Sequence, residues 1–319
     1  MRIGRVTPVQ WHLGGSELAE LRFDGKAVLV TGAGRGAGRT HALLLASRGA
    51  KVVVADPGVS MEGSGHSNGP ADEVVAEIKA AGGEAVACYE SVAEQKGANA
   101  MVQAALDSFG RLDAVINNAG IADPKSFEEY SIEDVRRMTD VHYYGTLFVS
   151  QAAWRHFLKS GGGRIVNTGS EGAMGIQPRC TTYGGAKGGV MGLTLALASE
   201  GGPHGISANV ICPRVASRMS TPEVLAQVFD RPVENFKPLG DNYRPELCSV
   251  TAVYLAHEAC PLNGMMLVSG GGQVMRIAFM QNEGITSDNL TIEVVADNIG
   301  KILDMSTAAH VGIGAGGAS

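Results

Sequence analysis

Short apolar runs alternate with helical stretches along the chain, from about residue 26 to residue 212. The apolar runs are AVLVT, KVVVAD, EAVACY, LDAVIN, RIVNTGS and ISANVIC. Runs this short and this apolar are typical of strands that are buried on both faces. The pattern therefore predicts an α/β fold, in which one doubly wound parallel sheet is flanked by helices on both faces. Folds of this kind bind ligands beyond the carboxyl ends of their strands.

Composition narrows the class of protein. The chain has 319 residues, of which 45% are hydrophobic and 18% charged, so it can bury a sizeable core. Its net charge of −6 argues against nucleic acid as a partner. No apolar run approaches a membrane span, MRIGRVTPVQWHLGG lacks the core of a signal peptide, and the chain ends in GAS rather than a peroxisomal Ser-Lys-Leu. We therefore expect a cytoplasmic protein that binds neither membrane nor nucleic acid.

The five cysteines are odd in number and show no Cys-x-x-Cys spacing. A zinc site and a disulfide framework are therefore both unexpected, and a reducing compartment is the better interpretation. No metal site is predicted.

The chain is expected to form one domain with two short appendages. Residues 1–22 are predicted to be an N-terminal extension, residues 23–304 the domain, and residues 305–319 a flexible, glycine-rich tail. Within the domain, residues 57–70 form a loop that is too long for an ordinary connection, and residues 214–242 could form a lid. Long loops of this kind are often functional.

A glycine-rich turn, TGAGRGAG, follows the first predicted strand and opens a helix. Gly32 would permit the tight turn, Gly36 would let the backbone approach a pyrophosphate, and Gly38 would let the helix pack close to the sheet. The helix amino end would then hold the phosphates. An ordinary turn is the alternative, but the strand–turn–helix context favours a Rossmann-type dinucleotide site.

Asp56 ends the second predicted strand, where a carboxylate can accept hydrogen bonds from the adenosine ribose hydroxyls. A carboxylate at this place repels a 2′-phosphate and favours NAD over NADP. Arg35 instead favours NADP, because a guanidinium could pair with that phosphate. Since Arg35 can swing into solvent, NAD is the predicted cofactor.

Tyr183 and Lys187 lie one helical turn apart in the small-residue stretch TTYGGAKGG. Such a pair is often just two surface residues. Alternatively, Lys187 lowers the pKa of Tyr183 by charge attraction, so that the phenol can act as a general base.

These motifs together resemble the short-chain dehydrogenase/reductase family. The resemblance rests on the Thr31–Gly38 turn, on Asn117-Asn118-Ala119-Gly120, on Ser170, and on Tyr183-x-x-x-Lys187, with Ser170 13 positions before Tyr183. It covers roughly residues 24–272. It implies that Ser170 fixes the substrate oxygen and that Lys187 also holds the nicotinamide ribose. It further implies cofactor contacts by Ser91, Val92, Asn118, Ala119, Gly120, Pro213 and Ser217. Asn117 and Asn118 could equally be ordinary turn residues.

A closer resemblance is to the dehydrogenase unit of the peroxisomal multifunctional enzymes of fatty-acid β-oxidation. It rests on Tyr89-Glu90-Ser91-Val92, Val141-His142, Ala152-Ala153-Trp154 and Ser217-Arg218-Met219. The implied reaction is the oxidation of a (3R)-hydroxyacyl-CoA to the 3-ketoacyl-CoA. A dehydrogenase for a steroid-like alcohol and a catalytically idle NAD-binding sensor or scaffold are the alternatives.

Two positions depart from the wider family. His142 replaces a catalytic asparagine, and its role is either to offer its backbone carbonyl to a water near Lys187 or merely to pack. Arg214 replaces a glycine after Pro213, which makes the nicotinamide contact there less certain.

Further expectations concern charge and assembly. Arg214 and Arg218 are predicted to recognise the phosphates of coenzyme A, unless they are merely solvated lid charges. His41, His156 and His257 are expected on helix surfaces. The resemblance implies a homodimer or homotetramer that pairs through the helices at about 132–158 and 183–200.

Overall fold

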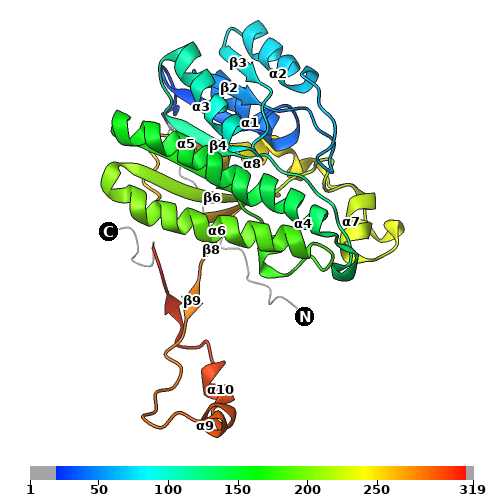
Figure 1. The fold of residues 1–319 in the computed structure, drawn as a ribbon, viewed down its shortest axis with the longest axis vertical. Helices are drawn as coiled ribbons and strands as arrows, with labels where there is room; N and C mark the ends of the chain where they lie inside the picture. The colour runs from blue at the N-terminus through cyan, green and yellow to red at the C-terminus, as the bar shows by residue number, and fades with distance from the viewer. Residues whose placement is uncertain (1–18, 314–319) are drawn as a thin grey trace.

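The structure, a computed structural model, describes residues 19–313. Its centre is an eight-stranded sheet in the order β3-β2-β1-β4-β5-β6-β7-β8 (Figure 1). The strands are β1 (Ala27–Thr31), β2 (Lys51–Ala55), β3 (Glu84–Cys88), β4 (Ala114–Asn117), β5 (Gly163–Thr168), β6 (Ile206–Arg214), β7 (Met266–Gly270) and β8 (Gln273–Ile277). Strands β1 to β7 run parallel, whereas β8 pairs antiparallel with β7. The predicted doubly wound sheet is confirmed.

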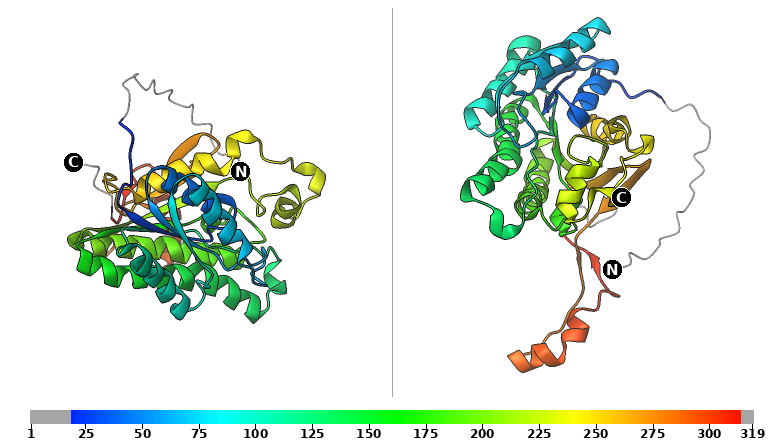
Figure 2. Two further views of the ribbon diagram at one scale, coloured as in Figure 1. Left: turned by 90° about the horizontal axis from the view of Figure 1, so that it is seen from above. Right: turned by 90° about the vertical axis from the view of Figure 1, so that its right-hand side faces the viewer.

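Helices cover both faces of this sheet (Figure 2). One layer contains α1 (Gly36–Ser47), α2 (Gly69–Ala80) and α8 (Pro245–Ala256), and the other contains α3 (Gln95–Phe109), α5 (Gly145–Ser160) and α6 (Thr181–Gly201). Successive strand side chains point to opposite faces, so Val28 and Val30 of β1 pack toward the first layer and Leu29 toward the second. This arrangement explains why β1 is buried along its whole length.

The predicted long helix at 132–158 is interrupted. It begins as α4 (Ile132–Thr139), continues as a π-helix (Asp140–Tyr144), and then becomes α5. Single π-helical turns inside α-helices frequently mark functional sites. His142 lies in this one.

A buried chain of polar side chains joins β4 and β5 to the helices behind them. The side-chain amide of Asn117 donates to Ser150 Oγ at 3.0 Å and to Asn167 Oδ1 at 2.9 Å. Asn167 in turn donates to Thr194 Oγ1 at 2.9 Å. Buried polar groups need such partners, so this network fixes α5 and α6 against the sheet.

The expected position on helix surfaces is wrong for two of the three histidines. His41 and His257 are buried rather than on helix surfaces, with 1% and 6% exposure. His41 Nδ1 lies 2.7 Å from Ser249 Oγ, which joins α1 to α8. His257 Nε2 lies 2.8 Å from the carbonyl oxygen of Arg22.

The last described residues form a small projection from the body (Figure 1). It contains the antiparallel pair β9 (Met280–Gln281) and β10 (Ala309–His310), and between them α9 (Ile292–Asp297) and α10 (Ile299–Ile302). Across residues 19–313, no helix is both long enough and apolar enough to cross a membrane. All five cysteines are free and buried.

Candidate active site

The glycine-rich turn has the geometry that the sequence predicts. Gly32 and Gly36 have φ angles of +62° and +54°, in the left-handed region that favours glycine. A Cβ atom on Gly38 would lie 2.1 Å from the carbonyl oxygen of Gly32, so the helix can approach the turn only without a side chain. No side chain caps the amino end of α1. Its first amide groups can therefore bind an anion.

The residues after β4 hold this turn in place. Thr31 Oγ1 accepts hydrogen bonds from the backbone amides of Asn118 at 3.0 Å and Ala119 at 3.1 Å. The Asn118 side chain donates to the carbonyl oxygens of Thr31 at 3.0 Å and Gly32 at 3.1 Å. Asn118 thus stabilises the glycine-rich turn, at the edge of the sheet where the cofactor is expected.

Asp56 follows β2 directly and joins the turn to the loop at 57–70. One carboxylate oxygen accepts from the amide of Gly34 at 2.8 Å, and the other accepts from the amide of Gly58 at 2.7 Å. The carboxylate is therefore fixed beside the glycine turn.

Two arginines meet in the same loop. Arg35 and Arg218 each donate to the carbonyl oxygen of Val59 at 3.3 Å, so their donor nitrogens lie no farther apart than twice that distance. Burial and the charge of Arg35 lower the pKa of Arg218. Among the described residues, no carboxylate lies within ion-pairing distance of either arginine.

Arg214 lies elsewhere and is already paired. Its guanidinium donates to both carboxylate oxygens of Glu171 at 2.5 Å. Arg214 therefore has no free positive charge to contribute to the predicted basic patch. Arg218 reaches the adenosine side of the predicted cofactor site, and the charge of Arg214 is balanced by Glu171.

Ser170, Tyr183 and Lys187 come together beyond the carboxyl end of β5. Ser170 precedes the short helix Glu171–Met174, while Tyr183 and Lys187 lie near the start of α6. Lys187 is 3% exposed, and its ammonium donates to the carbonyl oxygen of Thr168 at 2.6 Å. The same nitrogen lies 5.8 Å from the centre of the Tyr183 ring.

Burial dominates the electrostatics of these groups. It raises the pKa of Tyr183 to about 12, even though a hydrogen bond with Ser170 lowers it. Burial also lowers the pKa of Lys187 to about 8. The expected fall in the Tyr183 pKa is therefore wrong for the protein alone. The physical reason is that desolvation of the phenol outweighs charge attraction, since the Lys187 ammonium bonds Thr168 rather than the phenol.

His142 packs directly against Tyr183. The two rings meet edge to face with centres 5.1 Å apart, and His142 Nε2 lies 2.8 Å from the carbonyl oxygen of Ile121. A Cβ atom on Gly120 would lie 2.7 Å from the imidazole, so glycine there leaves room for the ring. Burial and the charge of Lys187 lower the pKa of His142 well below its usual value. The His142 imidazole is therefore neutral and packs against Tyr183.

The remaining predicted cofactor residues lie at the same edge of the sheet. Ser91 and Val92 follow β3, and Val92 is buried. Pro213 is the last residue but one of β6 and is paired with Ser269 of β7. Ser217 lies just beyond, where its backbone amide donates to Ser220 Oγ at 2.8 Å.

An apolar cluster that includes Tyr183 was not predicted from the sequence. Cys180, Val224 and Val228 are its buried members, and Met61, Tyr183 and Phe229 pack against them. Val224, Val228 and Phe229 belong to α7 (Pro222–Phe229), within the predicted lid. The unusual length of the 57–70 loop was the only signal for Met61.

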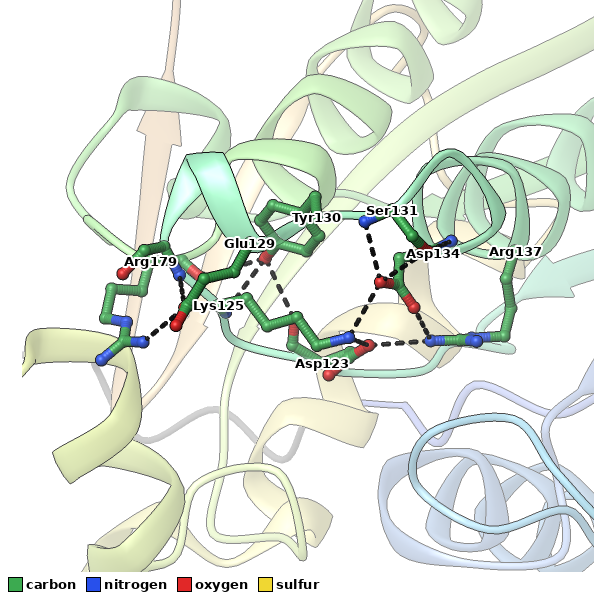
Figure 3. Close-up of polar contacts among 9 residues, drawn as sticks. Asp123, Lys125, Glu129, Tyr130, Ser131, Asp134, Arg137 and Arg179 are labelled. Atoms are coloured by element: carbon green, nitrogen blue, oxygen red, sulfur yellow. Dashed lines mark hydrogen bonds and ion pairs between the residues drawn. The ribbon is translucent and has the colours of Figure 1, made fainter.

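An ion-pair network holds the segment before α4 (Figure 3). Lys125 and Arg137 each contact both Asp123 and Asp134, at 2.8–2.9 Å. Arg179 continues the network to Glu129 and to Asp230 at the end of α7.

Comparison with known proteins agrees with this geometry. The family model described as short chain dehydrogenase matches residues 26–226. A mouse peroxisomal multifunctional enzyme type 2 is 41% identical over 295 residues, which are 91% of this chain but only 38% of the mouse protein. A short-chain type dehydrogenase/reductase of Mycobacterium tuberculosis is 40% identical over 90% of this chain and 97% of its own length. The crystal structure of a short chain dehydrogenase from Mycobacterium avium superposes with a TM-score of 0.75 at 34% identity, covering 88% of this chain and 97% of that one. This chain belongs to the short-chain dehydrogenase family and is an oxidoreductase that acts on CH–OH groups.

Proposed function

We propose that the chain oxidises a (3R)-3-hydroxyacyl-CoA to the 3-ketoacyl-CoA with NAD, using Tyr183 as the general base. The observation that carries this proposal is the meeting of Ser170, Tyr183 and Lys187 at the sheet edge that also holds the glycine turn. The relatives named peroxisomal multifunctional enzymes support an acyl-CoA substrate. A relative named 3-oxoacyl-[acyl-carrier-protein] reductase, 34% identical over 252 residues, supports a 3-oxoacyl thioester.

The residues at the sheet edge fit a dinucleotide. The uncapped amino end of α1 suits the pyrophosphate, and the fixed carboxylate of Asp56 suits the ribose of NAD. A solved 7α-hydroxysteroid dehydrogenase complexed with NADH superposes with a TM-score of 0.67 at 28% identity, which supports a nicotinamide cofactor. Arg35 and Arg218 weaken the discrimination against NADP, but the carboxylate favours NAD.

The reaction breaks one C–H bond and one O–H bond of the substrate. Ser170 donates a hydrogen bond that fixes the substrate oxygen. Tyr183, as phenolate, takes the proton of the substrate hydroxyl while the carbon that bears this hydroxyl loses a hydride. The products are a ketone, a protonated tyrosine and a reduced cofactor. When bound, the oxidised nicotinamide accepts this hydride and brings a positive charge beside the phenol.

That positive charge is needed because burial raises the pKa of Tyr183 to about 12. At neutral pH the phenol alone would stay protonated. Lys187 adds a second positive charge whose position is fixed by Thr168. We expect the phenolate to form only when both charges are beside it.

Two other functions remain as alternatives. A steroid-like alcohol is favoured by the similarity to the solved 7α-hydroxysteroid dehydrogenase. A catalytically idle NAD-binding sensor or scaffold would need neither Ser170 nor Tyr183, and their convergence argues against it.

A screen of the purified chain separates these functions. NADH formation is followed with a (3R)-3-hydroxyacyl-CoA, its 3S epimer and a 17β-hydroxysteroid, with NAD or NADP as acceptor. The proposal requires turnover of the 3R thioester above both other substrates, with NAD preferred. Faster steroid turnover would favour the first alternative, and NAD binding without any turnover would favour the second.

We also propose a homodimer or homotetramer that pairs through the helices at about 132–158 and 183–200. Tyr144 and Leu158 support this pairing, because they are exposed large apolar residues on or beside α5. Light scattering that gives the mass of one chain would exclude it.

A further inference from the structure

The loop at 57–70 connects the predicted cofactor site to the catalytic tyrosine. Its base is closed by a hydrogen bond from the Ser67 amide to the Pro57 carbonyl at 2.9 Å, and a turn within it by one from Ser60 to Ser64 at 2.7 Å. The Ala122 amide donates to the carbonyl oxygen of Met61 at 3.0 Å. Met61 is thus held against the segment that follows Gly120, although it lies only five residues after Asp56.

The Met61 side chain belongs to the apolar cluster around Tyr183. The other members of that cluster, besides Tyr183, are Cys180, Val224, Val228 and Phe229. Every member other than Tyr183 lacks a charged or hydroxyl group, so the cluster offers an apolar surface beside the phenol. A hydrocarbon group attached to the reacting carbon would find its contacts here.

Both sides of this surface are anchored. Val59 is bonded by Arg35 and Arg218, two residues before Met61. On the opposite side, the Arg179 amide donates to the Val228 carbonyl at 3.2 Å. The Arg179 guanidinium pairs with Asp230 and also with Glu129, and Figure 3 shows the pair with Glu129. A surface that is held from both sides can discriminate between substrates, because it cannot simply move away.

Met61 is also unlike the methionines of the core. Met101, Met138 and Met191 are 0%, 2% and 5% exposed, whereas Met61 is only half-buried. A methionine that served only to fill the core would be covered on all sides. Methionine is flexible and polarizable, and it adapts well to aliphatic groups of varied shape.

We propose that Met61 is a specificity-determining residue, which contacts the hydrocarbon portion of the substrate next to the carbon that is oxidised. This inference rests on the proposed function, since it takes Tyr183 to be the base that marks the reacting carbon. On this proposal, substrate selectivity depends in part on the loop at 57–70. The same loop follows Asp56, which is predicted to bind the ribose of the cofactor.

The test compares chain-length selectivity in Met61→Ala and the wild type. The substrates are (3R)-3-hydroxydecanoyl-CoA and (3R)-3-hydroxybutyryl-CoA, and the readout is the ratio of their kcat/KM values. We expect Met61→Ala to lower the ten-carbon to four-carbon ratio about tenfold, as for lost methylene-sized contacts in an apolar pocket. Met61→Leu should restore most of the ratio. Met305→Ala, at an exposed site of the projecting segment, should leave it at the wild-type value.

A double-mutant cycle with Val228→Ala adds a second criterion. If both side chains contact the same part of the substrate, their effects on the ratio should be non-additive. An unchanged ratio in Met61→Ala, with unfolding temperature also unchanged, would overturn the inference. So would a lower ratio that Met305→Ala reproduces.

A separate comparison keeps the inference testable if the acyl-CoA proposal fails. When the wild type turns over neither thioester, the same variants are compared with 2-decanol and 2-butanol in the presence of NAD. The readout is the rise in unfolding temperature. A larger rise with 2-decanol in the wild type that is lost in Met61→Ala supports the apolar contact. An equal rise in both proteins refutes it.

Discussion

Replacing Lys187 by methionine should change how stability depends on pH. Lys187 is 3% exposed, and burial lowers the pKa of its ammonium from 10.5 to about 8. In the unfolded chain this lysine keeps its proton up to the ordinary pKa. Between about pH 8 and the ordinary value, the unfolded state therefore binds more protons than the folded state, and the free energy of unfolding rises with pH.

The size of this effect follows from the pKa shift. The full shift corresponds to roughly 3 kcal/mol, of which about 2 kcal/mol is gained by about pH 9.5. The bond from Lys187 to the Thr168 carbonyl favours the ammonium and offsets part of the burial, so these values are upper limits. The methionine variant has no ammonium and should lack the rise.

Urea unfolding of both proteins across this pH range measures the difference. Other groups titrate there too, and those that do not interact with Lys187 cancel in the comparison because both proteins share them. Cys212 is an exception, since the charge of Lys187 lowers the pKa of its thiol. Lys159→Met, at an exposed position of α5, is the matched control and should follow the wild type. Parallel curves for the wild type and Lys187→Met would refute the reasoning, because they would mean that Lys187 titrates alike in both states.

Three further changes test other parts of the site. Asp56→Ala should weaken NAD binding and narrow the gap to NADP, since each lost charge-assisted hydrogen bond contributes about 1.5–3 kcal/mol; calorimetry that finds both affinities unchanged would exclude the ribose contact. Arg218→Gln should raise the Kd for NADP more than the KM for an acyl-CoA, because Arg218 lies with Arg35 on Val59; the opposite order would restore Arg218 to the substrate side. Gly38→Ala should destabilise the fold by on the order of 3 kcal/mol, because its Cβ would meet the Gly32 carbonyl at 2.1 Å, whereas Gly188→Ala, with open space around it, should not lower Tm.

Much of the fold could be predicted because its signals are local. Strands β1 to β6 are apolar runs bounded by turns, and the glycine turn and the Tyr183–Lys187 pair each lie within a few residues. Ser170 could be found because the family places it at a fixed distance before Tyr183. These residues meet because parallel strands end at one edge of a sheet.

The parts that could not be predicted depend on contacts between distant residues. Arg218 reaches Val59 across 159 positions, and His41 is buried because Ser249 lies beside it in the fold. No local pattern shows that Glu171 balances Arg214, or that Met61 and Tyr183 pack against the same apolar cluster. The direction of the Tyr183 pKa shift was missed for the same reason, because the sequence shows the nearby lysine but not how deeply the phenol is buried.

The most direct test of the central claim is the turnover of Tyr183→Phe with a (3R)-3-hydroxyacyl-CoA and NAD. The phenyl ring can keep its edge-to-face contact with His142, so the variant should fold and bind NAD with an unchanged Kd. Without the phenol its kcat should fall roughly 10²–10⁴-fold, the usual contribution of general acid–base catalysis. Near-normal turnover by a variant that binds NAD would show that another group takes the proton, and would contradict the account.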